Sequence, residues 1–194
     1  MKTTGLILSG GRSTRMGQCK GLLPLLGRPM ITHVLDRLEP QVDNVLVSAN
    51  ADIAHYEALG CEVVPDSRYP YKGPLAGIFN ALSVMQTDYL LVVPCDMPLL
   101  PTDLQSRLYR SLTENSASIA IAHDTQREQP LLSLLKREVC ASIQSALDAG
   151  EYSVMQWLSE QNYALAQFAD PSEFMNVNTP NTLKKLEVYL ETMA

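Results

Sequence analysis

Residues 4–11 read Thr-Gly-Leu-Ile-Leu-Ser-Gly-Gly, a short apolar run that leads directly into two adjacent glycines. A run of this kind predicts a buried β-strand that enters a loop. Tyr89–Val93 is the most apolar run of the chain and leads in the same way into Pro94, Cys95 and Asp96. Strands that are apolar on both faces indicate a mainly parallel sheet covered by helices on both sides.

The rest of the chain alternates between helix-like and strand-like stretches. Helices are expected over residues 29–38, 51–59, 75–85, 101–112, 137–147, 154–158 and 179–192. Further strands are expected over residues 44–48, 61–64, 118–122, 131–135 and 164–168. This alternation predicts an α/β fold, and the absence of a repeat or linker predicts one domain over residues 1–194. In such sheets, ligands bind beyond the carboxyl ends of the strands.

The composition excludes several classes of protein. The chain has 194 residues, 46% of them hydrophobic, and a net charge of −6, which is typical of a globular protein. It has no apolar run long enough for a transmembrane helix, and we expect no secretory signal because the first apolar stretch is short and is broken by Ser9 and two glycines. An acidic chain without a Lys/Arg-rich tract is a poor binder of duplex nucleic acid. The four cysteines form no C-x-x-C pair, so neither a zinc knuckle nor a redox pair is indicated. Because no export signal is expected, we expect reduced thiols and a cytoplasmic location.

The charge is unevenly distributed along the chain. Residues 1–35 contain five basic residues and no acidic one, whereas residues 36–194 contain ten basic and 21 acidic residues. The two segments therefore have charges of +5 and −11. A basic zone on an acidic protein indicates a small anionic ligand.

The loop after the first strand has the components of a phosphate-binding turn. Gly10 and Gly11 let the backbone approach a ligand and present N–H donors. Its spacing matches neither G-x-G-x-x-G nor the P-loop pattern. Hydroxyl groups and positive charges surround the same turn, on Arg12, Ser13, Thr14, Arg15 and Lys20.

The stretch LSGGRSTRMGQCK at residues 8–20 resembles the signature loop of nucleotidyltransferases that activate a phosphorylated substrate with a nucleoside triphosphate. Within that superfamily, the chain is most similar to the molybdenum cofactor guanylyltransferases of the MobA type. The supporting motifs are GLLPLLGRPM at 21–30, GPLAG at 73–77, PCDMP at 94–98 and FMNVNTP at 174–180. The resemblance implies a three-layer nucleotide-binding (Rossmann-like) fold, and the length fits a short branch without an added domain.

The resemblance also implies which residues of this loop hold the nucleotide. Lys20 matches the family lysine that contacts the phosphates. Family members commonly have Asp just before this lysine, where this chain has Cys19. The other loop residues implied around the base and phosphates are Leu8, Ser9, Gly10, Gly11 and Arg15.

Asp96 follows a buried strand, which places its carboxylate in the expected ligand crevice. Oxygen ligands in a partly hydrated site suit Mg²⁺, which takes one or two carboxylates together with substrate phosphates. The alternative is a turn aspartate that accepts hydrogen bonds from nearby backbone N–H groups. The resemblance favours the first reading and implies that Asp96 is the Mg²⁺ ligand.

Asp66 follows the third expected strand and matches a family aspartate that contacts GTP. One carboxylate can accept both N1–H and the exocyclic amine of guanine, and adenine offers no such pair. We expect Asp66 to select guanine in this way, with a ribose contact as the alternative. Family members often have Asn at the position of Ser48, and Asn50 is a nearby candidate for that nucleotide contact.

Asn176 and Asn178 alternate, so in an extended chain both side chains face the same way. The resemblance places this NVNTP segment at the active site, where it would support the metal or the acceptor phosphate. The alternative is that these asparagines bond their own loop backbone. Gln129 stands where relatives often have His and is a candidate border of the pterin site.

The activity implied by the resemblance is transfer of GMP from GTP to the terminal phosphate of molybdenum cofactor, with Lys20, Arg15 and Asp96 as catalytic residues. The attacking phosphate is already anionic, so positioning and charge neutralisation suffice. Expected partners are the two substrates, with transient contacts to cofactor biosynthesis proteins and acceptor molybdoenzymes, and neither nucleic acid nor membrane. The alternatives are a cytidylyltransferase for the same pterin or a sugar phosphate, and a GTP-binding module without turnover.

Overall fold

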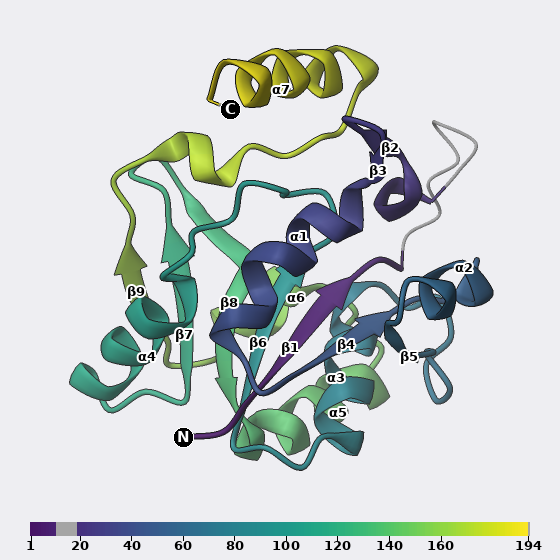
Figure 1. The fold of residues 1–194 in the computed structure, drawn as a ribbon. Coiled ribbons are helices and arrows are strands. Elements are labelled where there is room, and N and C mark those ends of the chain that lie inside the picture. The colour runs from purple at the N-terminus through teal and green to yellow at the C-terminus, as the bar shows by residue number, and fades with distance from the viewer. Residues whose placement is uncertain (11–18, 194) are drawn as a thin grey trace.

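A computed structural model describes residues 1–10 and 19–193 (Figure 1). Its centre is a seven-stranded sheet with the strand order β5-β4-β1-β6-β8-β7-β9. Six strands run in one direction and β8 runs against them, because it pairs antiparallel with both β6 and β7. The predicted mainly parallel α/β sheet is therefore confirmed. The strands are β1 Thr3–Leu8, β4 Asn44–Ser48, β5 Glu62–Val64, β6 Tyr89–Pro94, β7 Ile119–His123, β8 Glu128–Lys136 and β9 Ala164–Gln167.

The register brings the ends of the central strands together at one edge. Leu8, the last residue of β1, lies opposite Ser48 of β4 and Pro94 of β6. The pairing continues for one residue on each side, since Ser9 N donates to Ser48 O at 2.9 Å and Cys95 N donates to Leu8 O at 3.1 Å. The loops that begin at residues 9, 49 and 95 therefore leave the sheet side by side.

Helices cover both faces of the sheet and bury two apolar cores. On one face, α1 and α4 pack against inward residues such as Ile7 and Leu91. On the other, α3, α5 and α6 pack against their strand neighbours Leu6 and Leu90. The alternation of neighbouring strand residues between two cores explains why these strands are apolar throughout. The helices are α1 Met30–Leu38, α2 Ile53–Ala58, α3 Pro74–Val84, α4 Leu104–Glu114, α5 Cys140–Asp148, α6 Val154–Ser159 and α7 Pro180–Met193.

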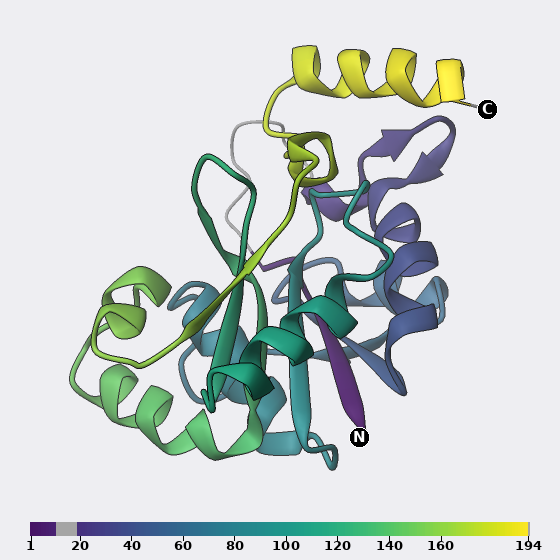
Figure 2. The same cartoon turned by 90° about the vertical axis from the view of Figure 1, so that its left-hand side faces the viewer.

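A small third cluster joins the C-terminal helix to a hairpin that the sequence pattern does not predict. The hairpin pairs β2 Pro24–Leu25 with β3 Arg28–Pro29, and α7 lies across it (Figure 2). Leu186 of α7, Leu25 and Val177 are fully buried in this cluster. The 174–180 segment is thereby held beside residues 23–30. No helix within the described residues is long and apolar enough to cross a membrane.

Candidate active site

Three polar side chains from distant parts of the chain meet beyond the carboxyl ends of β1 and β6. Lys20 lies in a short 3₁₀ helix, Lys20–Leu22, and its Nζ is 3.1 Å from Oδ2 of Asp96. The same ammonium group donates to Oδ1 of Asn178. The backbone N–H of Val177 donates to the carbonyl oxygen of Asp96 at 2.9 Å, which fixes the asparagine segment against the aspartate. The structure thus brings three of the predicted site residues together.

Two side-chain oxygen atoms, one of this cluster and one of the adjoining asparagine segment, have no hydrogen-bond partner among the described residues. They are Oδ1 of Asp96 and Oδ1 of Asn176, and both are buried. A buried acceptor without a donor is costly, so these atoms suit an added donor or a cation. Within the described chain, no group of three or more His, Cys, Asp or Glu side chains could hold a metal. A carboxylate oxygen with an amide oxygen fits Mg²⁺, which completes its ligand shell with water and substrate phosphates.

Beside this cluster, a cavity of about 200 Å³ lies beyond the ends of β1, β4 and β5. Its lining includes four of the residues expected to bind the nucleotide, and its walls are Ser9, Gly10, Cys19, Asn50, Ala51, Asp66, Tyr71 and Gly73. Burial, with a hydrogen bond to Asp52, raises the pKa of the Cys19 thiol to about 11, so Cys19 brings no negative charge to this wall at neutral pH. Four residues that the sequence predicts to bind the nucleotide thus line one cavity, and their contact with a nucleotide stays a prediction.

Asp66 is buried in the wall of this cavity and is held by two amides. Nδ2 of Asn50 donates to Oδ2 of Asp66 at 2.6 Å, and Nδ2 of Asn80 donates to Oδ1 at 3.3 Å. Oδ1 of Asn50 also accepts the backbone N–H of Asp66 at 2.8 Å. Asn50, expected to contact the nucleotide, therefore binds Asp66 with both ends of its amide. Asn80 is a functional candidate that the sequence reasoning missed.

Ser9 and Ser48, both expected to contact the nucleotide, are buried and make contacts within the protein itself. The Ser9 hydroxyl is 2.6 Å from the hydroxyl of Tyr56, a fully buried residue of α2 that no sequence pattern marks. Ser48 is 3% exposed and lies beneath α3, where a Cβ on Gly77 would come within 2.5 Å of its Oγ. A glycine at position 77 is therefore needed for α3 to approach the sheet. Leu8, at the end of β1, is half-buried.

The basic residues that the structure describes in the N-terminal zone, residues 1–35, do not form a single patch. Lys2 precedes β1 at the amino edge of the sheet, opposite the site. Arg28 lies in β3 and pairs on the surface with Asp36 at 2.8 Å. Of the basic residues that the structure describes in this zone, Lys20 alone reaches the site. Gly11, Arg12 and Arg15 lie outside the described residues, so their expected roles remain predictions.

Gln129 stabilises the turn between β7 and β8. Its Nε2 donates to Oδ2 of Asp124 at 2.6 Å, while Oδ1 of Asp124 accepts the backbone N–H groups of Gln126 and Arg127 at 3.1 and 2.9 Å. Burial pushes the pKa of Asp124 upward, but these hydrogen bonds outweigh it and hold the pKa below its ordinary value. The predicted role of Gln129 at the pterin site stays a prediction.

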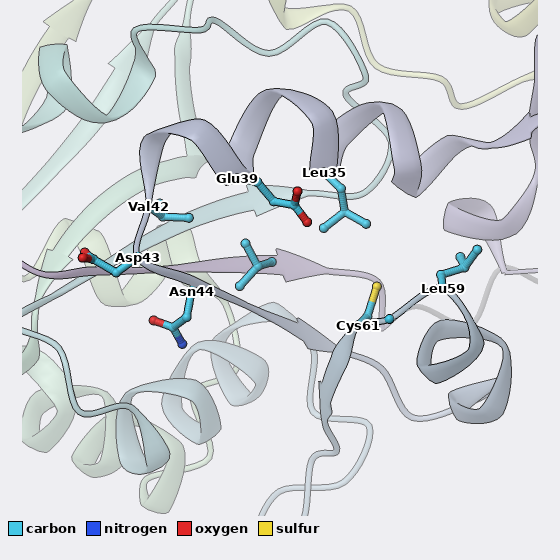
Figure 3. A pocket seen from close by; sticks show the side chains of 9 residues that line it. Leu35, Glu39, Val42, Asp43, Asn44, Leu59 and Cys61 are labelled. Atoms are coloured by element: carbon cyan, nitrogen blue, oxygen red, sulfur yellow. The ribbon is translucent and has the colours of Figure 1, made fainter.

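A second cavity, of about 290 Å³, has a separate set of lining residues (Figure 3). It is found where β4 begins and where the chain enters β5, between the end of α1 and the turn after α2. Its lining residues are Leu35, Glu39, Val42, Asp43, Asn44, Val45, Leu59, Gly60 and Cys61. None of the predicted site residues lines it.

Solved structures share this architecture. One is molybdopterin-guanine dinucleotide biosynthesis protein A from Archaeoglobus fulgidus, with a TM-score of 0.80, 22% identity, and coverage of 97% of this chain and 99% of that one. Another is a CMP:2-keto-3-deoxy-manno-octonic acid synthetase complexed with CTP, with a TM-score of 0.80, 15% identity, and coverage of 100% of both chains. At these identities the likeness shows the fold alone, and it defines the chain as an α/β protein of the nucleotidyltransferase fold.

Sequence comparison specifies the family. Residues 5–164 match the model of the MobA-like NTP transferase domain. A molybdenum cofactor guanylyltransferase from Shewanella halifaxensis is 45% identical over 183 residues, which cover 93% of this chain and 92% of the relative. That of Shewanella sediminis is 44% identical over 188 residues, 96% of each chain. The chain therefore belongs to the MobA-like NTP transferase family, as the signature loop predicts.

Proposed function

We propose that this protein transfers GMP from GTP to the terminal phosphate of molybdenum cofactor, giving the guanine dinucleotide form of the cofactor and pyrophosphate. The observation that carries the proposal is the cluster of Lys20, Asp96 and Asn178 beside the cavity lined by Asp66. Relatives that are 44–46% identical over more than nine-tenths of the chain are named for this activity, which supports the choice of nucleotide and acceptor.

The proposed reaction requires the protein to position the two substrates and to offset the negative charge of their phosphates. A phosphate monoester is anionic at neutral pH, so the attacking oxygen needs no general base. The residues must bring two anionic phosphates into line and offset their combined charge. Lys20 is suited to this role because Asp96 and Asn178 hold its ammonium group from two sides before any substrate binds. A group oriented in advance loses little entropy in reaching the transition state.

Asp96 is the proposed Mg²⁺ ligand, and Asn176 is the candidate for a second oxygen. Both side chains have a buried oxygen that no described donor satisfies. When bound there, Mg²⁺ would supply a positive charge against the phosphate oxygens of the nucleotide and the acceptor. The proposal also includes a cytoplasmic location and transient contacts with the proteins that supply the cofactor and the molybdoenzymes that receive it.

Incubation of the purified protein with Mg²⁺, GTP and molybdenum cofactor tests this function directly. The proposal predicts the guanine dinucleotide by liquid chromatography, and much less product when CTP replaces GTP. It also predicts that Asp96→Ala abolishes product. Equal or preferential use of CTP would favour the cytidylyltransferase alternative, and GTP binding without any product would favour a module without turnover.

A further inference from the structure

We infer that Asn80 is a positioning residue for nucleotide selection, which with Asn50 orients the Asp66 carboxylate toward a base edge carrying two adjacent N–H donors. The inference rests on the proposed function, since it concerns the nucleotide that the site accepts. It concerns a helix residue outside the lining of the nucleotide cavity, whose effect on the ligand would pass through Asp66.

The Asn80 amide is a buried polar group in apolar surroundings, with Asp66 as its hydrogen-bond partner. Asn80 is 5% exposed and lies in α3, where Ile78, Phe79, Ala81 and Leu82 around it are all buried in the apolar core. A buried amide is destabilising unless it is hydrogen-bonded. Within the described chain, the side-chain hydrogen bond of Asn80 is the one from its Nδ2 to Oδ1 of Asp66. The helix therefore keeps a polar residue in its apolar face to hold one carboxylate.

The two amides fix both oxygens of Asp66 without a counter-charge. Asn50 holds Oδ2 at 2.6 Å and Asn80 holds Oδ1 at 3.3 Å. Among the described residues, no lysine, arginine or histidine forms an ion pair with Asp66. The torsion that turns a carboxylate is broad and soft. One bond to each oxygen restricts that rotation, so the two amides limit the plane in which the carboxylate accepts further bonds.

That plane suits a particular hydrogen-bonding pattern on the ligand. Each carboxylate oxygen has two acceptor positions, so one remains open on each oxygen after the amides have bound. Two parallel acceptors match two adjacent donors, as in a bidentate pair. Guanine presents N1–H beside its exocyclic amine, hypoxanthine has only the N1–H, and cytosine has its amine beside an acceptor. The arrangement therefore favours guanine, and Asn80 contributes by keeping both open positions aligned.

Loss of the Asn80 amide should therefore change the selectivity for the base while leaving the binding of the triphosphate in place. The cluster of Lys20, Asp96 and Asn178 does not depend on Asn80, so the triphosphate should still bind when the Asn80 amide is lost. A carboxylate that can rotate no longer offers two aligned acceptors. Loss of Asn80 should then weaken GTP more than ITP, which forms one of the two bonds.

Calorimetric titration with GTP, ITP and CTP in the presence of Mg²⁺ tests the inference. The variants are Asn80→Leu, which has a similar size without a donor, and Asn80→Asp, which replaces the donor by a like charge. We expect the wild type to prefer GTP over ITP, and both variants to reduce that preference by about tenfold, the effect of one hydrogen bond to a charged group. Asn115→Leu is the control, because Asn115 bonds the end of α4 at 2.8 Å far from the cavity, and it should leave the ratio unchanged.

The outcomes separate this inference from the proposed function. A wild type that prefers GTP, with the same GTP/ITP ratio in both folded Asn80 variants, would overturn the inference alone. A wild type without preference for GTP would overturn both. Circular dichroism establishes that each variant is folded. The two substitutions carry different risks of unfolding, since leucine suits the apolar core and aspartate keeps the shape of the amide.

Discussion

Replacement of Lys20 by methionine isolates the contribution of one ammonium group. Methionine keeps much of the apolar stem and removes the charge that lies 3.1 Å from Asp96. The Asp96 side chain is 11% exposed, and its other oxygen already lacks a described partner, so water can replace little of the lost interaction. A hydrogen bond to a charged group contributes about 1.5–3 kcal/mol. Because the Lys20 side chain is 28% exposed, the full cost of breaking a buried pair, about 3–5 kcal/mol, is an upper limit.

The effect on catalysis should be larger than the effect on folding. Removing one preorganised donor from a developing charge typically reduces kcat by about 10²–10³, or roughly 2.7–4 kcal/mol. Steady-state assays at saturating substrate measure kcat, and thermal denaturation should show a Tm lower by roughly 3–12 °C. Lys184→Met, on an exposed position of α7, is the matched control and should change neither quantity. Turnover of Lys20→Met within threefold of the wild type would refute the assignment of Lys20 to the phosphates.

Three further predictions concern the surroundings of the site. Gly77→Ala should destabilise the protein by about 1–3 kcal/mol in urea denaturation, because its Cβ would lie 2.5 Å from Ser48 Oγ, and adding Ser48→Gly should restore part of that loss. Tyr56→Phe removes the hydroxyl that bonds Ser9 and should cost about 0.5–1.5 kcal/mol while raising KM for GTP, and an unchanged KM would show that Ser9 is positioned without it. Asp124 has a lowered pKa, so its stabilising contribution is present above the ordinary value of 3.8 and is lost as pH falls through the lower folded value. Asp124→Asn should therefore lose less stability than the wild type during acid titration, and parallel titration curves would contradict this.

The sequence predicts the sheet well because its central strands are short apolar runs bounded by turn residues. The strand over residues 44–48 has the predicted bounds, and those of β1 and β6 differ by one residue at one end. The hairpin of β2 and β3 could not be predicted, since two residues per strand give no periodicity. The strand β8 begins at Glu128, three residues before the predicted run, because its first residues are polar or proline and carry no apolar signal.

Sequence motifs predict individual residues of the candidate site, but they do not predict the contacts between them. The resemblance names Lys20 and Asp96, but their direct contact depends on how the short 3₁₀ helix Lys20–Leu22 packs beside the end of β6. Asn80 carries a weak signal, as a lone polar residue inside an apolar helical run, a position where buried polar groups usually have a partner. Tyr56 has no signal at all, because an aromatic residue in a short amphipathic helix normally indicates core packing alone.

The fate of the α-phosphate of GTP tests the central claim most directly. The protein is incubated with Mg²⁺, molybdenum cofactor and GTP that is radiolabelled at either the α- or the γ-phosphate. Transfer of GMP predicts that the α-label appears in the cofactor product, in equal amount to the pyrophosphate released, and that the γ-label appears only in pyrophosphate. Recovery of the α-label as unreacted GTP, GDP or free GMP, with none in the cofactor, would contradict the account.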